Sequence, residues 1–247
     1  MAQLAVALAF VGGYVDAVGF VALAHVFTGH VTGNTVLLAI DVAEGTWTGM
    51  LQRMLAIVMF LAGMVLGAVL HAQIVRRGFC SRFAPAFALE AVLLTPLMLG
   101  DGAFTHGATQ IPRSGWTLYA LLALAATALG LQNGTLRKVS GSTAHTTYIS
   151  GAVSTVTESL LERWLGRRDR KPDRSATPAD AETAVNADAP GRATLVLLAG
   201  ITVSFAAGAL AGVLLYVSRG LASLAVPFVL LLVLAVVDAR RPLAETG

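Results

Sequence analysis

Long apolar stretches separated by short polar segments run along almost the whole chain. Six of them meet or approach the length of about 20 apolar residues that a helix needs to cross roughly 30 Å of hydrocarbon. They are residues 4–23, 51–75, 83–99, 116–131, 193–217 and 221–237. A membrane β-barrel would instead have alternating segments of about 10 residues. The pattern predicts an all-α integral membrane protein with about six transmembrane helices.

Two further apolar segments, 31–40 and 146–161, are too short to span. They open with Thr32-Gly33-Asn34-Thr35 and with Thr146-Thr147-Tyr148-Ile149-Ser150-Gly151. Ser, Thr and Asn favour helix N-caps, because their side chains bond the free N–H groups of the first turn. Non-helical backbone at membrane depth persists only where it is buried in protein or lines water. We expect two re-entrant half-helices or the far arms of broken helices; amphipathic segments lying flat on the surface are the alternative.

The two halves of the chain repeat one order of features. The first half has Gly13-Tyr14-Val15-Asp16, the first short element, Gly63-Met64-Val65-Leu66-Gly67 and a helix led by Pro85. The second has Gly130-Leu131-Gln132-Asn133, the second short element, Gly208-Ala209-Leu210-Ala211-Gly212 and a helix around Pro227. Three spans per copy force the second copy to cross the membrane in the opposite direction. We therefore expect a 3+3 inverted repeat, residues 1–114 and 115–247, whose substrate site would lie between the copies.

Two segments inside this scheme have expected roles of their own. Residues 166–192 hold a basic run followed by an Ala/Asp/Thr/Pro stretch, too poor in apolar residues to repay ordering, and predict a flexible cytoplasmic linker. Its basic run could also touch anionic headgroups. The small-residue pairs Gly63/Gly67 and Gly208/Gly212 suit close helix packing, and we expect these two helices to cross each other at the repeat interface.

Composition and charge agree with a membrane protein. The chain has 247 residues, 56% of them hydrophobic and 13% charged, with a mean hydropathy of +0.74, whereas soluble domains carry about 25% charged residues. The net charge of +3 would suit a nucleic-acid partner. However, all 17 Lys and Arg except Arg53, Arg113 and Arg219 fall where a single topology places them on one side. The positive-inside rule then puts both termini in the cytoplasm, and no nucleic-acid partner is expected.

Asp16 is the sharpest candidate for chemistry. It interrupts an apolar span, and an unpaired acid there costs roughly 2.5 kcal/mol or more on insertion scales. Such residues usually face the interior of a helix bundle and mark an ion or proton pathway. Its counterpart Asn133, preceded by Gln132, has the same shape and cannot ionise. The alternative is that Asp16 only ties helices together.

Other polar residues could join a site. Thr32, Gly33, Asn34 and Thr35 would meet Thr146, Thr147, Tyr148, Ser150 and Gly151 if the short elements converge, and their helix N-termini would favour a polar or anionic solute. His30 and His145 flank the short elements and could titrate near pH 6.5. Glu90 lies in an apolar span, where it could act in the path, or else extend toward the basic loop and pair with Arg82.

Enzyme motifs are missing from the sequence. It contains no P-loop, no G-x-S-x-G, no H-E-x-x-H and no C-x-x-C. Ser142 and His145 are close together, but nothing identifies an orienting acid or an oxyanion hole. We expect no catalytic residues, no metal and no cofactor.

The motifs resemble those of a known family. Gly13-Tyr14-Val15-Asp16-Ala17-Val18-Gly19-Phe20, Phe27 and Thr32-Gly33-Asn34-Thr35-Val36 resemble the first signature of the YoaK family, and the 130–133 and 146–151 motifs resemble its second. The resemblance covers nearly the whole chain apart from the linker. It implies a multi-pass protein of the bacterial inner membrane with a domain of unknown function, and it supplies no activity.

These observations lead to two main hypotheses for the function; a membrane-embedded enzyme is a third that they disfavour, because no nucleophile–base pair stands out. The first is a secondary transporter or channel for a small polar or anionic solute, with Asp16 as the proton- or ion-coupled group. The second is a non-transporting scaffold or partner-binding protein, in which the polar motifs are capping and packing devices. In both, the lipid bilayer is the surrounding partner.

Overall fold

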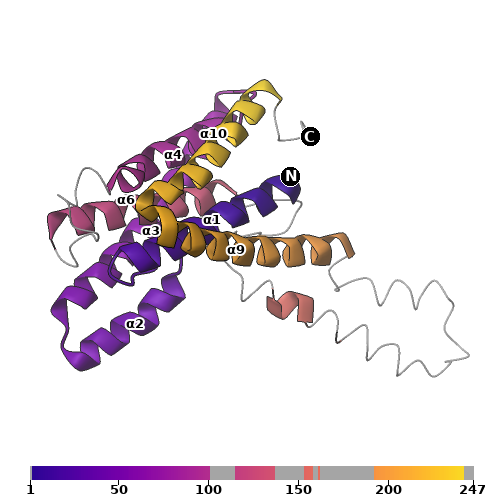
Figure 1. The fold of residues 1–247 in the computed structure, drawn as a ribbon. Helices are drawn as coiled ribbons and strands as arrows, with labels where there is room; N and C mark the ends of the chain where they lie inside the picture. The colour runs from indigo at the N-terminus through magenta and orange to yellow at the C-terminus, as the bar shows by residue number, and fades with distance from the viewer. Residues whose placement is uncertain (1, 101–114, 137–152, 158–160, 162–191, 242–247) are drawn as a thin grey trace, which may run out of the picture.

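The structure is a computed structural model that describes residues 2–100, 115–136, 153–157, 161 and 192–241. Within these ranges the regular elements are all helical. In chain order (Figure 1) they are α1 (Ala2–Ala22), α2 (Val31–Glu44), α3 (Trp47–Arg76), α4 (Ala84–Met98), α6 (Trp116–Thr135), α9 (Arg192–Arg219), η1 (Gly220–Leu224) and α10 (Ala225–Arg240). Each of the six long apolar segments expected from the sequence is therefore helical. The 166–191 part of the expected linker lies outside the described residues.

Three helical stretches are long and apolar enough to cross a membrane. They are Ala2–Ala22, Trp47–Arg76 and Ala193–Arg240, the last of which holds α9, η1 and α10; α4 is a shorter apolar helix. In its most apolar window α1 is 67% buried, whereas the other two stretches are only 22% and 28% buried. Exposed apolar surface of that extent needs a lipid environment. The chain is a membrane protein with α1 at the centre of its bundle.

Two close helix pairs form the body of the bundle. α1 packs mainly on α9 and α3 mainly on α6, while α4 lies against both α10 and α6 (Figure 1). Residues later in one helix contact residues later in its partner: Val6 of α1 lies near Gly200 of α9, and Tyr14 lies near Gly212. The helices of each close pair therefore run in the same direction.

Glycines let these pairs approach closely. A Cβ atom at Gly13 would overlap the carbonyl oxygen of Phe205, and one at Gly208 that of Phe10. In the other pair, a Cβ at Gly63 would overlap the carbonyl of Thr127. The expectation that the two helices with paired glycines cross each other was wrong, because within the described residues α3 and α9 do not touch. Each instead packs on the first long helix of the other half, which supplies its own glycines.

A helical hairpin projects from the bundle. α2 and α3 are joined at Gly45 and Thr46, and Gly45 adopts a left-handed conformation with a φ of 71°. Glycine reaches this conformation without strain, which allows the chain to reverse directly after α2. α2 packs on α3, and much of its surface is exposed (Figure 1).

Asp238, in the last turn of α10, ties that helix to the start of α4. Its Oδ2 accepts hydrogen bonds from the hydroxyl of Ser81 at 2.7 Å and from the backbone N–H groups of Phe83 and Ala84, both at 2.8 Å. Pro85 follows within the first turn of α4, where a missing N–H group costs nothing. The Pro-led starts predicted for α4 and α10 are confirmed.

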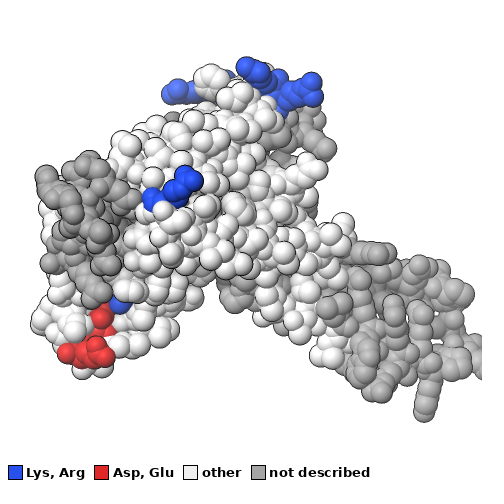
Figure 2. All heavy atoms as spheres, viewed as in Figure 1, with Lys and Arg blue, Asp and Glu red and all other residues white. Residues whose placement is uncertain are grey.

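Charged side chains gather at two places on the surface. Arg76 and Arg77 end α3, Arg82 precedes α4, and Arg240 and Arg241 end α10. Among the residues that the structure describes, Figure 2 shows most of the Lys and Arg at the end of the molecule where α10 finishes, and the visible Asp and Glu near the tip of the α2–α3 hairpin. We call the first of these places the basic end.

Candidate functional site

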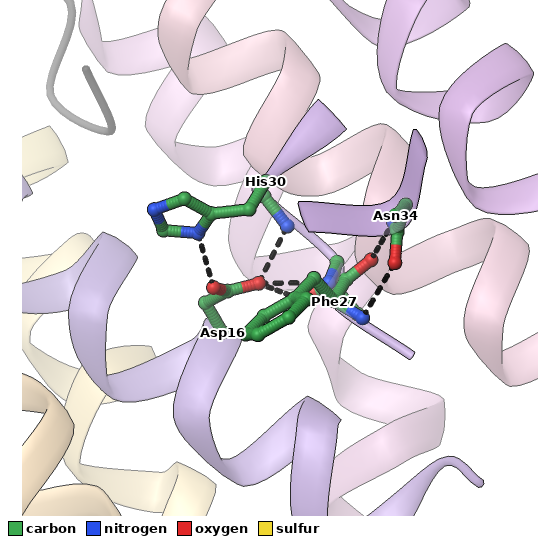
Figure 3. A network of polar contacts seen from close by, with 6 residues as sticks. Asp16, Phe27, His30 and Asn34 are labelled. Carbon is green, nitrogen blue, oxygen red and sulfur yellow. Dashed lines mark hydrogen bonds and ion pairs between the residues drawn. The ribbon is translucent and has the colours of Figure 1, made fainter. Parts of the chain in front are cut away.

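Asp16 organises the connection between α1 and α2. Its residue is 3% exposed, and its Oδ1 accepts the backbone N–H groups of Thr28 at 2.7 Å and Gly29 at 2.6 Å, together with the Thr28 hydroxyl at 3.1 Å (Figure 3). Hydrogen bonds that an ionised acceptor takes from backbone N–H groups are among the strong ones. A carboxylate in a candidate membrane span thus fixes a short stretch of irregular backbone.

His30 completes the coordination of this carboxylate. Its Nδ1 lies 2.6 Å from the Asp16 Oδ2, and the second ring nitrogen points away from Asp16 (Figure 3). The ring also contacts Phe205 of α9 edge-on, with centroids 5.5 Å apart, and 28% of the side chain is exposed. The hydrogen bond to Asp16 raises the pKa of His30 and outweighs burial, which lowers it. We call Asp16 and His30 the acid–histidine pair.

Asn34 closes the connection from the side of α2. It is 2% exposed; its Nδ2 donates to the carbonyl oxygen of Phe27 at 2.6 Å, and its Oδ1 accepts the Phe27 N–H at 3.0 Å (Figure 3). Gly33 lies against the Phe27 ring, where a Cβ would come within 2.9 Å of a ring carbon. The Gly33–Asn34 motif therefore holds Phe27 in place.

The predicted N-capping role of this motif was wrong. The N-cap of α2 is His30, and its side chain makes no capping hydrogen bond. Thr32 is exposed, and the Thr35 hydroxyl donates to the carbonyl of Val31 at 2.8 Å. The physical reason is that Asn34 bonds backward to Phe27, which leaves it unable to serve the first turn. The helix itself begins at Val31, where the sequence placed it.

The connection after α1 holds strained backbone. Ala24 and His25 have φ values of 52° and 58°, in the left-handed region that costs a residue with a Cβ about 1–2 kcal/mol. Arg53 of α3 donates from Nη1 to the His25 carbonyl at 3.0 Å. Strain of this kind persists only where the surroundings impose it, and it clusters at switch regions and binding sites. Here the acid–histidine pair and Arg53 impose it.

A second charged pair was not anticipated. Asp41 of α2 lies 2.9 Å from the Nε of Arg53, both side chains are 11% exposed, and the Thr46 hydroxyl donates to Asp41 at 2.9 Å. Arg53 thus bridges α2, α3 and the strained connection. The available signal was an acid near the end of an apolar helix, followed by a Gly-Thr turn and a lone arginine in the next helix.

The second half contributes polar residues at other positions. Gln132 of α6 is buried and donates to the Leu8 carbonyl at 2.8 Å, about 12 Å along α1 from Asp16 at 1.5 Å per residue. Asn133 donates to Leu129 of its own helix at 2.8 Å. The remaining predicted residues lie outside the described part of the chain, and their convergence with α2 stays a prediction. They are His145, Thr146, Thr147, Tyr148, Ser150 and Gly151.

Glu90 does not extend toward the basic loop or pair with Arg82. It is 0% exposed, and it shares the buried face of α4 with Phe87, Ala91 and Leu94. That spacing turns its side chain into the bundle, away from water. Among the described residues, no three His, Cys, Asp or Glu side chains gather as a metal-binding group.

Comparisons with known proteins agree with a membrane location. Residues 4–237 match a family described as "Protein of unknown function (DUF1275)". The chain is also similar to the UPF0700 transmembrane protein YoaK of Bacillus subtilis (strain 168), with 23% identity over 164 residues that cover 66% of this chain and 69% of the relative. No solved structure matches the chain. The resemblance to the YoaK family expected from the two signatures is confirmed.

Proposed function

The chain belongs to the DUF1275 family of membrane proteins, and we propose that it is a secondary transporter or channel for a small polar or anionic solute, coupled to protons through Asp16. The proposal gives it the lipid bilayer and that solute as partners and assigns it no catalytic step. The acid–histidine pair carries the proposal, because it unites a buried carboxylate in a candidate span with a partly exposed imidazole whose pKa is raised above its ordinary value.

The chemistry of the pair suits coupling. When His30 is protonated, the pair is neutral overall, and the ring nitrogen that points away from Asp16 can donate a hydrogen bond to a solute (Figure 3). The first N–H groups of α2 begin directly after His30 and add the positive end of a helix dipole. When His30 loses its proton, the Asp16 charge remains uncompensated, so proton release and solute release favour each other.

The arrangement of the helices supports an inverted 3+3 repeat. In such a repeat, a first helix and the second helix of the opposite copy cross the membrane in the same direction. α1 with α9 and α6 with α3 run in parallel in this way, each pair with glycines at its contact. α4 and α10, the third helices of the copies, lie against each other.

The same scheme gives a topology. With the basic end in the cytoplasm of a bacterial inner membrane, both termini are cytoplasmic and the tip of the α2–α3 hairpin lies outside. α2 then starts at the depth of Asp16 and runs outward, as the far arm of a broken helix. The strained connection at Ala24 and His25 is the break.

A scaffold is the second candidate, and one observation favours it. Asp16 and Asn34 bind backbone groups of the α1–α2 connection, as purely structural devices would. On this view the pair holds the connection closed, and no solute reaches it.

Transport assays with purified protein in liposomes separate the two candidates. A pH-sensitive dye inside the liposomes would report proton movement while small polar and anionic solutes are offered under an imposed pH gradient. We expect at least one solute to drive proton movement with the parent protein. Asp16→Asn should lose this movement and stay folded, because the amide oxygen can still accept from Thr28 and Gly29. Proton movement no greater than in empty liposomes with every solute would favour the scaffold.

A further inference from the structure

One acidic side chain of the bundle stands apart from the acid–histidine pair. Glu90 lies in the middle of α4, on the buried face that also carries Phe87, Ala91 and Leu94, and it is 0% exposed. Neither of its carboxyl oxygens has a hydrogen-bond partner in the described part of the chain. At 1.5 Å per residue it lies about 9 Å along the helix from Ala84.

The other buried acids among the described residues all have hydrogen-bond donors or an ion-pair partner. Asp16 receives two backbone N–H groups, a hydroxyl and His30; Asp41 pairs with Arg53 and accepts from Thr46. Asp238, also 0% exposed, receives the Ser81 hydroxyl and two N–H groups at the start of α4. The fold supplies donors to each of these carboxyl groups and supplies none to Glu90.

The helices packed on α4 carry few groups that could donate to the Glu90 carboxyl group or compensate its charge. α4 contacts α6, α10, η1 and α3, and η1 carries no titratable residue. The groups on the others are Tyr119 of α6, Arg53, His71 and Arg76 of α3, and Asp238 and Arg240 of α10. Arg53 is held in the ion pair with Asp41. Asp238 is bound to the start of α4, and His71 stacks on Phe83 with ring centroids 5.4 Å apart. Both therefore lie toward the basic end, about two helical turns from Glu90.

A carboxylate ion without donors in such surroundings is far more costly than a neutral acid. We propose that Glu90 is a proton-binding site in the interior of the membrane bundle, which holds its proton at neutral pH. It gives the proton up only when water or a cation reaches it. This site is separate from the acid–histidine pair and does not depend on the proposed transport through that pair.

A hydrophobic carbodiimide tests the proposal directly. The protonated acid adds across one C=N bond of the reagent: its oxygen bonds to the central carbon, and its proton moves to a nitrogen. A shift of the acyl group to the other nitrogen then leaves a stable N-acylurea that carries the whole reagent. The experiment uses the full chain in lipid vesicles at neutral pH with dicyclohexylcarbodiimide, and peptide mapping by mass spectrometry locates the adduct.

We expect the adduct at Glu90 in the parent protein and none at that position in Glu90→Gln. Asp16, Asp41 and Asp238 should stay unmodified, because hydrogen-bond donors or an ion-pair partner already occupy their carboxyl oxygens. A water-soluble carbodiimide should not modify Glu90, which separates a buried acid from a surface one. Absence of the adduct at Glu90, or equal modification of the other three buried acids, would overturn the proposal.

A second measurement needs no variant that could misfold. Infrared spectra of the parent protein with isotope-labelled glutamate should contain the carbonyl stretch of a protonated carboxylic acid between about pH 6 and pH 8, where an ordinary glutamate with a pKa near 4.3 is ionised. A spectrum without that band would show an ionised Glu90 and contradict the proposal. Neither readout requires transport, so a negative transport assay would leave this result standing.

Discussion

At the residue scale, the α1–α2 connection depends on one carboxylate and one imidazole. Asp16 alone would be an uncompensated charge in an apolar span, and His30 alone would lose its strongest hydrogen bond. Together they hold the irregular backbone that Thr28 and Gly29 contribute. The two side chains come from positions 14 residues apart, so the local sequence already brings them near each other.

The raised pKa of His30 makes the stability of the protein depend on pH. The ion pair contributes its full stability below the pKa of a free histidine, about 6.5, and loses it as the pH rises through the higher pKa of the folded protein. We therefore expect the unfolding temperature to fall as the pH is raised above neutral. Thermal unfolding of the detergent-purified protein over this range measures the effect.

Variants of the two histidines near this connection provide the comparison. His30→Gln should flatten the fall, because a group that does not titrate replaces the imidazole. His25→Asn should keep it, because Asn tolerates the left-handed backbone of that position and leaves the acid–histidine pair intact. A pH dependence that survives His30→Gln unchanged would show that another group causes it.

At the element scale, the close helix pairs depend on the absence of side chains. Gly13→Ala would place a methyl group inside the carbonyl of Phe205, so α1 and α9 must separate. Overpacking of this kind costs about 1–3 kcal/mol, and we expect the free energy of unfolding to fall by at least that amount. Denaturant titration in mixed micelles measures it.

Gly200→Ala on the same pair of helices is the matched control. Its methyl group would lie 3.5 Å from a methyl carbon of Val6, an ordinary contact. Since alanine also favours a helix by about 0.5–1 kcal/mol over glycine, this variant should be neutral or slightly more stable. Equal losses in both variants would mean that the α1–α9 approach is not the limiting contact.

The α2–α3 hairpin depends on Arg53. Arg53→Gln removes the ion pair with Asp41 and weakens the contact to the His25 carbonyl. Because the two charges are largely buried, we expect the free energy needed to open α2 locally to fall by about 1–3 kcal/mol. Hydrogen exchange should become faster in residues 31–44 and stay slow in the core of α3.

An acid of α2 that does not contact Arg53 serves as the control. Glu44 is exposed at the end of α2, and Glu44→Gln should leave the exchange pattern unchanged. Faster exchange spread evenly over α1, α3 and α6 would instead show that Arg53 supports the whole bundle. In that case the hairpin would not be a separately held element.

The extent of the helices could be predicted from the sequence because apolar length is a local property. The six segments and the start of α2 at Val31 depend on residues that neighbour each other in the chain. The partner of each glycine face could not be predicted, because Gly63 and Gly208 fit any helix with a small-residue face. The partner helices become clear only from the structure, in which Gly13 lies against α9 and Gly130 lies against α3.

The residues of the candidate site could be predicted from the sequence, but most of their partners could not. Asp16, His30 and Asn34 were singled out as chemical types, and they lie together around Phe27. Apart from the Asp16–His30 contact and the Thr28 hydroxyl, the partners of Asp16 and Asn34 are backbone N–H and C=O groups, which no sequence pattern marks. The role of Asp238 at the start of α4, more than 150 residues away, was missed for the same reason.

At the scale of the whole molecule, the proposal depends on the orientation of the bundle in the membrane and on the depth of Asp16. In the proposed topology the basic end faces the cytoplasm and α2 runs outward from the depth of Asp16, so water would have to reach the acid–histidine pair from the side of the hairpin. The native Cys80, exposed at the basic end, and a cysteine at Thr32, exposed in the first turn of α2, report on the two sides.

Labelling of these two positions with membrane-impermeant maleimides, from each side of intact cells and inverted vesicles, is the most direct test. The account predicts that Cys80 of the parent protein reacts only from the cytoplasm. Thr32→Cys in a Cys80→Ser background should react only from outside. If Thr32→Cys reacts from the cytoplasmic side, or only after denaturation, the outward path to the acid–histidine pair does not exist and the transport proposal fails.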